Sequence, residues 1–206
     1  MLHMRLKLKV ILIVKKVKEG RGMKKHVCPW WIGYFLLSPV RKIKQNPEKI
    51  LSPYVEKGMT CMDLGSAMGY FSLPMAKLTG AEGKVICIDL QEKMLSALKR
   101  RARRAGLENH ISARLCGDDS LRINDLVESI DFALAFAMVH EVPDAEIFFK
   151  EAAAALRPGG MLLFVEPAGH VKKEAFRKSV EAAAIAGLTA VNDVTVWRSH
   201  GVLLKK

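Results

Sequence analysis

Residues 59–71 hold an apolar run, a turn bracketed by glycines and the start of a helix, and this stretch constrains the fold most. The apolar run ends at Asp63, and Gly65 and Gly69 then enclose a turn of small residues. Residues at helical spacing follow the turn, at Phe71, Leu73, Met75 and Leu78. Small residues let a ligand approach the backbone closely, and the first N–H groups of a helix attract negative charge. We therefore expect a ligand with an anionic group at this turn.

The spacing of the glycines separates two classes of ligand. A dinucleotide fingerprint, Gly-x-Gly-x-x-Gly, needs glycine at positions 65, 67 and 70. The chain has Gly65, Ala67 and Tyr70 there, so this fingerprint fails twice. The stretch instead resembles motif I of class I methyltransferases that use S-adenosylmethionine (SAM), an acidic residue followed by Gly-x-Gly-x-Gly. Asp63, Gly65, Ala67 and Gly69 carry the resemblance. Because alanine has a Cβ, the sequence does not itself indicate a positive φ at position 67.

Strand and helix patterns alternate along the rest of the chain. Apolar runs predict five strands of a parallel sheet, at residues 59–64, 84–89, 111–116, 131–137 and 161–165. Helices are expected from 47 to just before Gly58, after the glycine turn as far as 79, and at 91–105, 146–156 and 171–186. Residues 188–197 and 201–204 predict a terminal hairpin. The expected fold class is α/β, a Rossmann-like, doubly wound, seven-stranded and mainly parallel sheet with an antiparallel C-terminal hairpin.

The length of 206 residues, half of them hydrophobic, suits one domain with a substantial core. We assign residues 47–206 to a SAM-binding methyltransferase domain, 23–46 to an aromatic cap segment and 1–22 to a basic leader. A second specific match to the methyltransferase family is the Arg-Pro-Gly-Gly run at 157–160, directly before an apolar strand.

The leader, residues 1–22, carries seven lysines and arginines against one glutamate, which is half of the chain's net charge of +12. Its unbroken apolar run, residues 10–14, is far shorter than the roughly 20 residues of a membrane span. Three interpretations stay open: an edge strand, a basic membrane-surface segment, or an extension upstream of a natural start at Met23. We favour the extension, and a disordered leader agrees with it.

Large aromatic side chains are concentrated in the cap segment, at Trp30, Trp31, Tyr34 and Phe35. In the family that the chain resembles, the segment before motif I commonly forms the substrate-side wall, which implies that role for Trp30, Trp31 and Tyr34. Alternatively, these aromatic residues fix the leader to the core, or seat it on a partner or a membrane surface.

Asp89 ends the second expected strand, twenty residues past Gly69. Its two acceptor oxygens suit the paired ribose hydroxyls of an adenosine, which the dinucleotide fold places at the same distance. A helix N-cap is the alternative, and one carboxylate can serve both purposes. The methyltransferase resemblance implies further cofactor-binding residues after the first four strands: Ser66, Leu90, Gly117, Asp118, Ala135 and Phe136. Asp118 corresponds to an acidic residue that accepts from the adenine amino group; Asp119 is the alternative, and either can be a turn former.

His140 and Glu141 follow the fourth expected strand, at the edge where open α/β sheets bind ligands. A histidine there can take a proton from a hydroxyl or amine nucleophile. It can equally be a satisfied structural group near Pro143. Glu166, at the end of the fifth strand, is a weaker candidate for the substrate side.

The resemblance implies a SAM-dependent methyltransferase of the small-molecule, quinone-methyltransferase-like branch, which transfers the methyl group by in-line displacement. The alternatives are a nucleic-acid methyltransferase and a non-enzymatic SAM-binding protein. Nucleic acid is the less favoured partner, because the remaining basic cluster, residues 99–104, lies at the end of an expected helix and there complements the helix dipole.

The four cysteines show no paired spacing of a metal or redox site, so we expect no metal. Cys61, Cys87 and Cys116 fall within expected strands, where they serve as small buried hydrophobes. Cys28 stands outside a strand pattern and without a visible partner, and we expect it to be inert. These cysteines point to a reducing, cytoplasmic setting.

Overall fold

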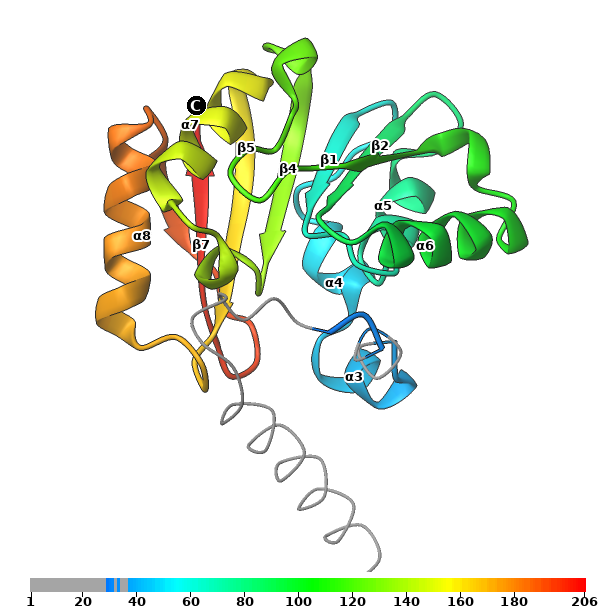
Figure 1. Cartoon of the computed structure of the whole chain (residues 1–206), viewed down its shortest axis with the longest axis horizontal. Coiled ribbons are helices and arrows are strands. Elements are labelled where there is room, and N and C mark those ends of the chain that lie inside the picture. Colours follow the sequence, from blue (N-terminus) through cyan, green and yellow to red (C-terminus); the bar gives the residue numbers. More distant parts are fainter. Residues whose placement is uncertain (1–28, 32, 34–36) are drawn as a thin grey trace, which may run out of the picture.

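A seven-stranded sheet forms the centre of the protein (Figure 1). The computed structural model describes residues 29–31, 33 and 37–206. Its strands are β1 (Thr60–Leu64), β2 (Lys84–Asp89), β3 (Ile111–Leu115), β4 (Ile130–Phe136), β5 (Leu156–Pro167), β6 (Thr189–Asp193) and β7 (Ser199–Lys205). They lie in the order β3-β2-β1-β4-β5-β7-β6, with β1 to β5 parallel and β7 antiparallel to both of its neighbours. The expected fold class is therefore confirmed, including the terminal hairpin.

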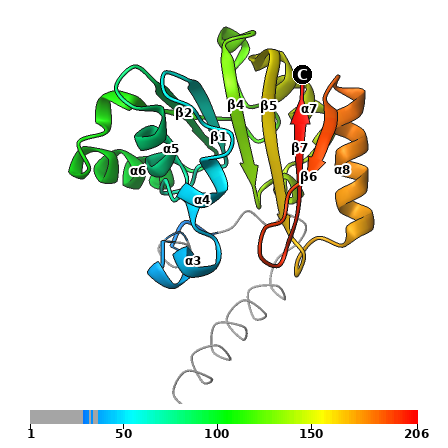
Figure 2. The same cartoon turned by 180° about the vertical axis from the view of Figure 1, so that it is seen from behind.

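Helices cover both faces of this sheet, as the views from the front and from behind show (Figures 1 and 2). The helices are α3 (Pro39–Lys44), α4 (Pro47–Leu51), α5 (Ser72–Thr79), α6 (Glu92–Arg104), α7 (Ala145–Ala155) and α8 (Lys173–Ile185). Short 3₁₀ turns lie at Glu108–His110, Asn124–Leu126 and Val139–Glu141. Asn46 caps α4 and Asp144 caps α7, because each side chain accepts hydrogen bonds from two free N–H groups of the first turn.

Alternate residues of each central strand belong to different apolar clusters. On β1, Met62 packs in the cluster that contains Phe149 of α7 and Phe176 of α8. Its neighbour Cys61 points the other way, into the cluster of Met75 of α5. Since successive strand side chains face opposite sides, the continuous apolar strands of the sequence supply both layers of the core.

The order of strands reverses direction at β1, which lies between β2 and β4. The chain passes from β1 outward to β2 and β3, then returns to β4 on the other side of β1. In open α/β sheets such a switch leaves a crevice at the carboxyl ends of the strands, and that is where ligands bind. Gly65, directly after β1, borders this crevice together with Asp89 and Phe136 at the ends of β2 and β4.

Several elements differ in length from the expected ones. Helix α4 ends at Leu51 and not just before Gly58, and the sequence did not indicate α3. Strand β5 begins at Leu156, so the Arg-Pro-Gly-Gly run lies inside the strand and not before it. Gly160 is required there, because a Cβ would lie 2.9 Å from the carbonyl oxygen of Arg157 and 3.0 Å from that of Ile130.

The basic leader, residues 1–22, lies outside the described residues, as do Cys28, Tyr34 and Phe35. Among the residues that the structure does describe, no helix combines the length and the apolar character needed to cross a bilayer.

Replacing Leu134 by alanine should lower the free energy of unfolding by about 2 to 5 kcal/mol, because a fully buried side chain of the central strand is lost and a cavity remains. Val191→Ala is the matched control, since Val191 is 48 % exposed on the edge strand β6 and should cost less than about 0.5 kcal/mol. Chemical denaturation measures both. Equal losses for the two variants would contradict the described core.

Candidate functional site

The loop after β1 is held against the end of β2 by its backbone. The N–H groups of Gly65 and Ser66 both donate to the carbonyl oxygen of Ile88, at 2.9 Å each. Gly65 has a φ of 72° and Gly69 a φ of 79°, which glycine adopts without strain. Ala67 also has a positive φ, 46°, so the loop imposes here a conformation that its Cβ disfavours. Helix α5 starts only at Ser72, so this loop and not the helix N-terminus lines the crevice.

The carboxylate of Asp89 connects the same loop to the next one. Its Oδ2 accepts from the N–H of Ala67 at 2.8 Å, and its Oδ1 accepts from the N–H of Gln91 at 2.8 Å. Burial raises the pKa of Asp89, and the two backbone hydrogen bonds partly offset this. Each oxygen keeps a further lone pair, so the carboxylate can still accept hydrogen bonds from a ligand.

Asp63 lies beneath the loop and is almost fully buried. Its Oδ2 accepts a hydrogen bond of 2.5 Å from Oγ of Ser72, the first residue of α5. Burial raises the pKa of Asp63 to about 7, and the nearby carboxylate of Asp89 contributes to this increase. A cationic ligand group beside Asp63 would favour its ionised form.

A cavity of about 1030 Å³ opens at the carboxyl edge of the sheet, slightly above the roughly 300 to 1,000 Å³ that is usual for small-molecule sites. Its wall includes twelve of the residues predicted from the sequence: Trp31, Asp63, Gly65, Ser66, Ala67, Asp89, Leu90, Gly117, Asp118, Phe136, His140 and Glu141. The structure thus brings together residues from four strand ends and from the cap segment.

Ser66 gives this cavity a test of fit for an amino-acid ligand. The residue is only 4 % exposed, and its Oγ has no hydrogen-bond partner among the described residues. Buried hydroxyl groups are normally paired, so an unpaired one in a cavity wall calls for a polar ligand group. The residues present therefore suit SAM, which carries both a ribose and an amino-acid end.

The cap segment supplies a cation that the sequence analysis missed. The guanidinium carbon of Arg41 lies 4.2 Å from the ring centroid of Tyr70 and 5.7 Å from that of Phe136. The hydroxyl of Tyr70 donates to the carbonyl oxygen of Gln45 at 2.8 Å, which ties this segment to the glycine loop. Arg41, Gln45 and Tyr70 all line the cavity. The signal was present as a basic residue within the aromatic segment, but its distance from motif I in the sequence concealed it.

His140 is oriented by a buried carboxylate. Oε1 of Glu166 accepts from the backbone N–H of His140 at 3.0 Å, and Oε2 lies 2.7 Å from Nδ1 of its ring. An ionised carboxylate only accepts, so Nδ1 carries the proton and the neutral imidazole keeps its lone pair on Nε2. Nε2 lies 3.9 Å from Oε1 of Glu141, and the ring centroid lies 6.2 Å from that of His170, another cavity residue.

This pairing also sets the proton affinity of His140. The hydrogen bond that His140 donates to Glu166 raises the pKa of His140, burial lowers it, and the charges of Glu166 and Glu141 raise it again, with a net increase. Because the folded pKa lies above the unfolded one of about 6.5, the pair stabilises the fold fully below that pH. This contribution is lost as the pH rises through the raised pKa.

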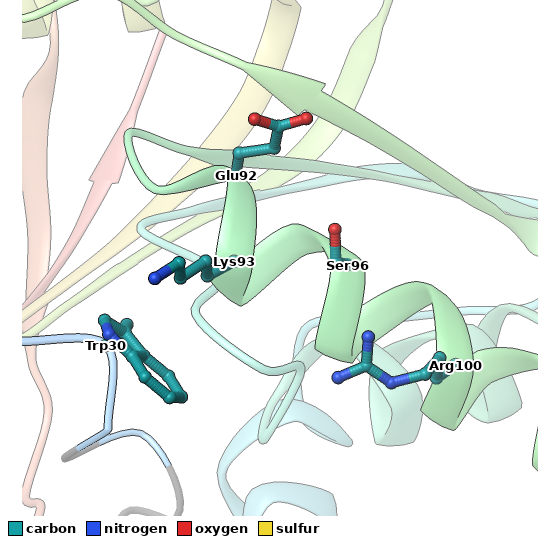
Figure 3. A pocket seen from close by; sticks show the side chains of 5 residues that line it. All are labelled: Trp30, Glu92, Lys93, Ser96 and Arg100. Atoms are coloured by element: carbon teal, nitrogen blue, oxygen red, sulfur yellow. The ribbon is translucent and has the colours of Figure 1, made fainter.

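Some predicted residues do not lie on the cavity wall. Ala135 is fully buried in the sheet, Gly69 lies where a Cβ would collide with the side chain of Leu98, and Glu166 is buried behind His140. Trp30 lines a separate pocket of about 210 Å³ against α6, where Nζ of Lys93 lies 5.0 Å from its ring centroid (Figure 3). Trp30 therefore differs from Trp31, which lies on the main cavity, and Tyr34 lies outside the described residues.

The third strand ends in a loop that α7 holds in place. Oε1 of Glu151 accepts from Oγ of Ser120 and Oε2 accepts from the N–H of Leu121, both at 2.6 Å. Asp118 and the alternative Asp119 both line the cavity, so the structure leaves that choice open. Cys116 was expected inside the third strand, but β3 ends one residue earlier, and Cys116 is only partly buried on the cavity wall. Burial raises the pKa of its thiol to about 11. No group of three metal-ligating side chains occurs in the part of the chain that the structure describes.

A family model for a methyltransferase domain matches residues 55–199, which is more than half of the chain. The chain belongs to the family of SAM-dependent methyltransferases. This match confirms the resemblance to class I SAM-dependent methyltransferases that motif I indicated.

Two similar relatives have names related to quinones. A demethylmenaquinone methyltransferase of Staphylococcus aureus is 30 % identical over 54 % of this chain and 44 % of its own length. A ubiquinone biosynthesis O-methyltransferase of Sinorhizobium fredii is 30 % identical over 73 % of this chain and 54 % of its own length. The chain spans about half the length of these relatives.

The fold of the family appears in solved structures as well. A SAM-dependent methyltransferase from Aquifex aeolicus superimposes with a TM-score of 0.78 and 22 % identity, covering 87 % of this chain and 99 % of that one. At this identity the likeness shows the fold alone.

Replacing Glu166 by glutamine should lower the pKa of His140, because the neutral amide removes the strongest acceptor for Nδ1. A titration of the imidazole resonances by nuclear magnetic resonance measures this pKa in both proteins. Glu174→Gln, an exposed change on α8, is the control and should leave it unchanged. An unchanged pKa in Glu166→Gln would show that Glu166 does not pair with His140 in solution.

Proposed function

We propose that this protein transfers a methyl group from SAM to a small-molecule acceptor by in-line displacement. One observation carries this proposal: the glycine loop with Asp89, and His140 with its buried partner Glu166, border the same cavity. A cofactor end and a proton-accepting end thus share one enclosed space.

Different residues of the cavity wall bind the different parts of SAM. Asp89 accepts from the ribose hydroxyls, while Asp118, or Asp119 in its place, accepts from the adenine amino group. Oγ of Ser66 and the guanidinium of Arg41 bind the carboxylate of the amino-acid end, and Asp63 favours its ammonium group. Leu90 and Gly117 would border the adenosine of bound SAM, and Phe136 would form the wall on the side of its sulfonium.

SAM, when bound, supplies a methyl carbon on a sulfonium, whose leaving group needs no further activation. The protein's task is then to bring the acceptor into line at about 3 to 3.5 Å from that carbon and to keep it there. Phe136, Tyr70 and Trp31 form apolar walls for this purpose. Glu141, 3.9 Å from Nε2 of His140, stabilises the imidazolium that proton uptake creates.

His140 acts as the general base in this proposal. Its Nε2 receives the proton of the acceptor's hydroxyl or amine while the new bond to the methyl group forms. Glu166 holds the ring in the required tautomer through two hydrogen bonds, so it is a positioning residue. The structural alternative, a histidine that only anchors the loop after β4, predicts no effect on turnover.

The acceptor is proposed to be of the quinol or phenol type. The names of two relatives support this, and so does a cavity wall that is mostly apolar. A nucleic-acid substrate is disfavoured, because the basic cluster lies in the last turns of α6, where its cations complement the helix dipole. We place the protein in the cytoplasm, which the reduced thiols of Cys61 and Cys87 support.

Replacing Asp89 by alanine should weaken SAM binding by about 10- to 100-fold, since hydrogen bonds to a charged acceptor are lost and the glycine loop loses an anchor. Isothermal titration calorimetry measures the affinity. Asp125→Ala, an exposed carboxylate that pairs with Arg114, is the control. If wild type and Asp89→Ala bind SAM equally, the ribose assignment is wrong.

Replacing His140 by glutamine should lower kcat/KM by about 10²- to 10⁴-fold with SAM affinity retained. Catechol and naphthohydroquinone probes serve as acceptors, with methylated product detected by mass spectrometry. Because the base must be neutral, wild-type activity should rise with pH through the raised pKa of His140. SAM binding without methylation of any probe would favour the non-enzymatic alternative, and unchanged turnover would favour the structural role.

A further inference from the structure

Exposed apolar and cationic side chains lie together on a face that the proposed chemistry does not use. Ile43 of α3 is 82 % exposed, and Trp197, between β6 and β7, is 46 % exposed. Nζ of Lys44 lies 4.2 Å from the ring centroid of Trp197, and the guanidinium carbon of Arg198 lies 5.5 Å from it. Two elements far apart in the sequence are thereby joined. We call Ile43, Lys44, Trp197 and Arg198 the rim patch.

The rim patch lies beside the cavity. Helix α3 and the loop between β6 and β7 both project at the carboxyl edge of the sheet, as the two opposite views agree (Figures 1 and 2). Arg41, on the same helix as Ile43, lines the cavity, and Trp31 lines it while remaining 39 % exposed. The patch and the mouth of the cavity therefore face the same way.

We propose that the rim patch docks on the surface of an anionic lipid bilayer. Tryptophan sits well at the boundary of acyl chains and headgroups, and lysine and arginine reach from an apolar stem to lipid phosphates. Lys44 and Arg198 both lie over the ring of Trp197, and Ile43 precedes Lys44 on α3, so the charge of the patch is complementary to anionic headgroups. An apolar patch alone would fit many partners, but this mixture of side chains fits a membrane interface.

The charge of the whole chain favours the same partner. Its net charge is +12, and a positively charged protein is drawn toward an anionic surface over about a Debye length. Pro29 and Trp31 both border the cavity.

Docking in this orientation turns the cavity toward the lipid. An acceptor dissolved in the bilayer can then reach His140 without crossing water, a consequence that rests on the proposed function. The docking itself does not depend on methyl transfer, so the two proposals fail independently.

The experiment uses the full chain and unilamellar vesicles of phosphatidylcholine, with and without roughly one-third phosphatidylglycerol. Co-sedimentation gives the partition coefficient. The apolar variant is Ile43→Ser with Trp197→Ser, and its matched control is Val127→Ser with Ile185→Ser. Val127 and Ile185 are 64 % and 73 % exposed and lie near the opposite edge of the sheet.

A second pair of variants tests the charge. Lys44→Gln with Arg198→Gln removes two cations of the patch, and Arg103→Gln with Arg104→Gln removes two exposed cations of α6. We expect wild type to prefer the anionic vesicles and each patch variant to bind them at least about tenfold more weakly. For the charge variant this follows because one cation near such a surface contributes about fivefold and two cations are removed. Both controls should bind nearly as wild type does.

Several results would overturn the docking proposal. They are an absence of vesicle binding, equal binding to neutral and anionic vesicles, and control variants that lose as much as the patch variants. Binding to polyglutamate in place of vesicles would identify an acidic protein as the partner and would also overturn it. SAM affinity, measured for every variant, shows that the variants are folded and reports separately on the cofactor site.

Discussion

The carboxylate of Asp89 is the contact on which the geometry of the site depends. It accepts from the backbone N–H of Ala67 on one side and from that of Gln91 on the other, so the loops after β1 and β2 are fixed to each other. Burial alone would favour a neutral Asp89, and the two N–H donors oppose this. Ala67 is held at a positive φ, which is slightly strained for alanine, because the other hydrogen bonds of the loop fix its backbone there.

The cofactor end of the site could be predicted from the sequence because its residues follow strand ends. A continuous apolar run predicts β2, and the carboxylate that closes this run marks Asp89 as a residue of the sheet edge. Ala135 could be placed less well, since strand register decides which residue of β4 faces the cavity and which is buried. Arg41 could not be found by this reasoning, because its approach to Tyr70 depends on how the cap segment crosses the sheet.

The acceptor side of the cavity, around His140, could be predicted from the sequence even less completely. His140 and Glu166 are each recognisable as residues at strand ends, but the sequence does not indicate that they pair with each other. They are brought together because β4 and β5 are adjacent and parallel, which places the turn after one strand over the end of the next. The pair follows from sheet order, which depends on long-range contacts that local sequence patterns do not encode.

The wall contributed by Arg41 and Gln45 is attached to the sheet differently from the cofactor loop. Both residues are only half-buried: the Tyr70 hydroxyl donates to the carbonyl oxygen of Gln45, and the guanidinium of Arg41 lies over the Tyr70 ring. The glycine loop, in contrast, is hydrogen-bonded to the backbone of β2. Mutations in that wall therefore disturb few buried groups. During divergence this segment can be exchanged for another that keeps a cation for the carboxylate of SAM, while the loops that hold the nucleoside are retained, so one scaffold can acquire new methyl acceptors.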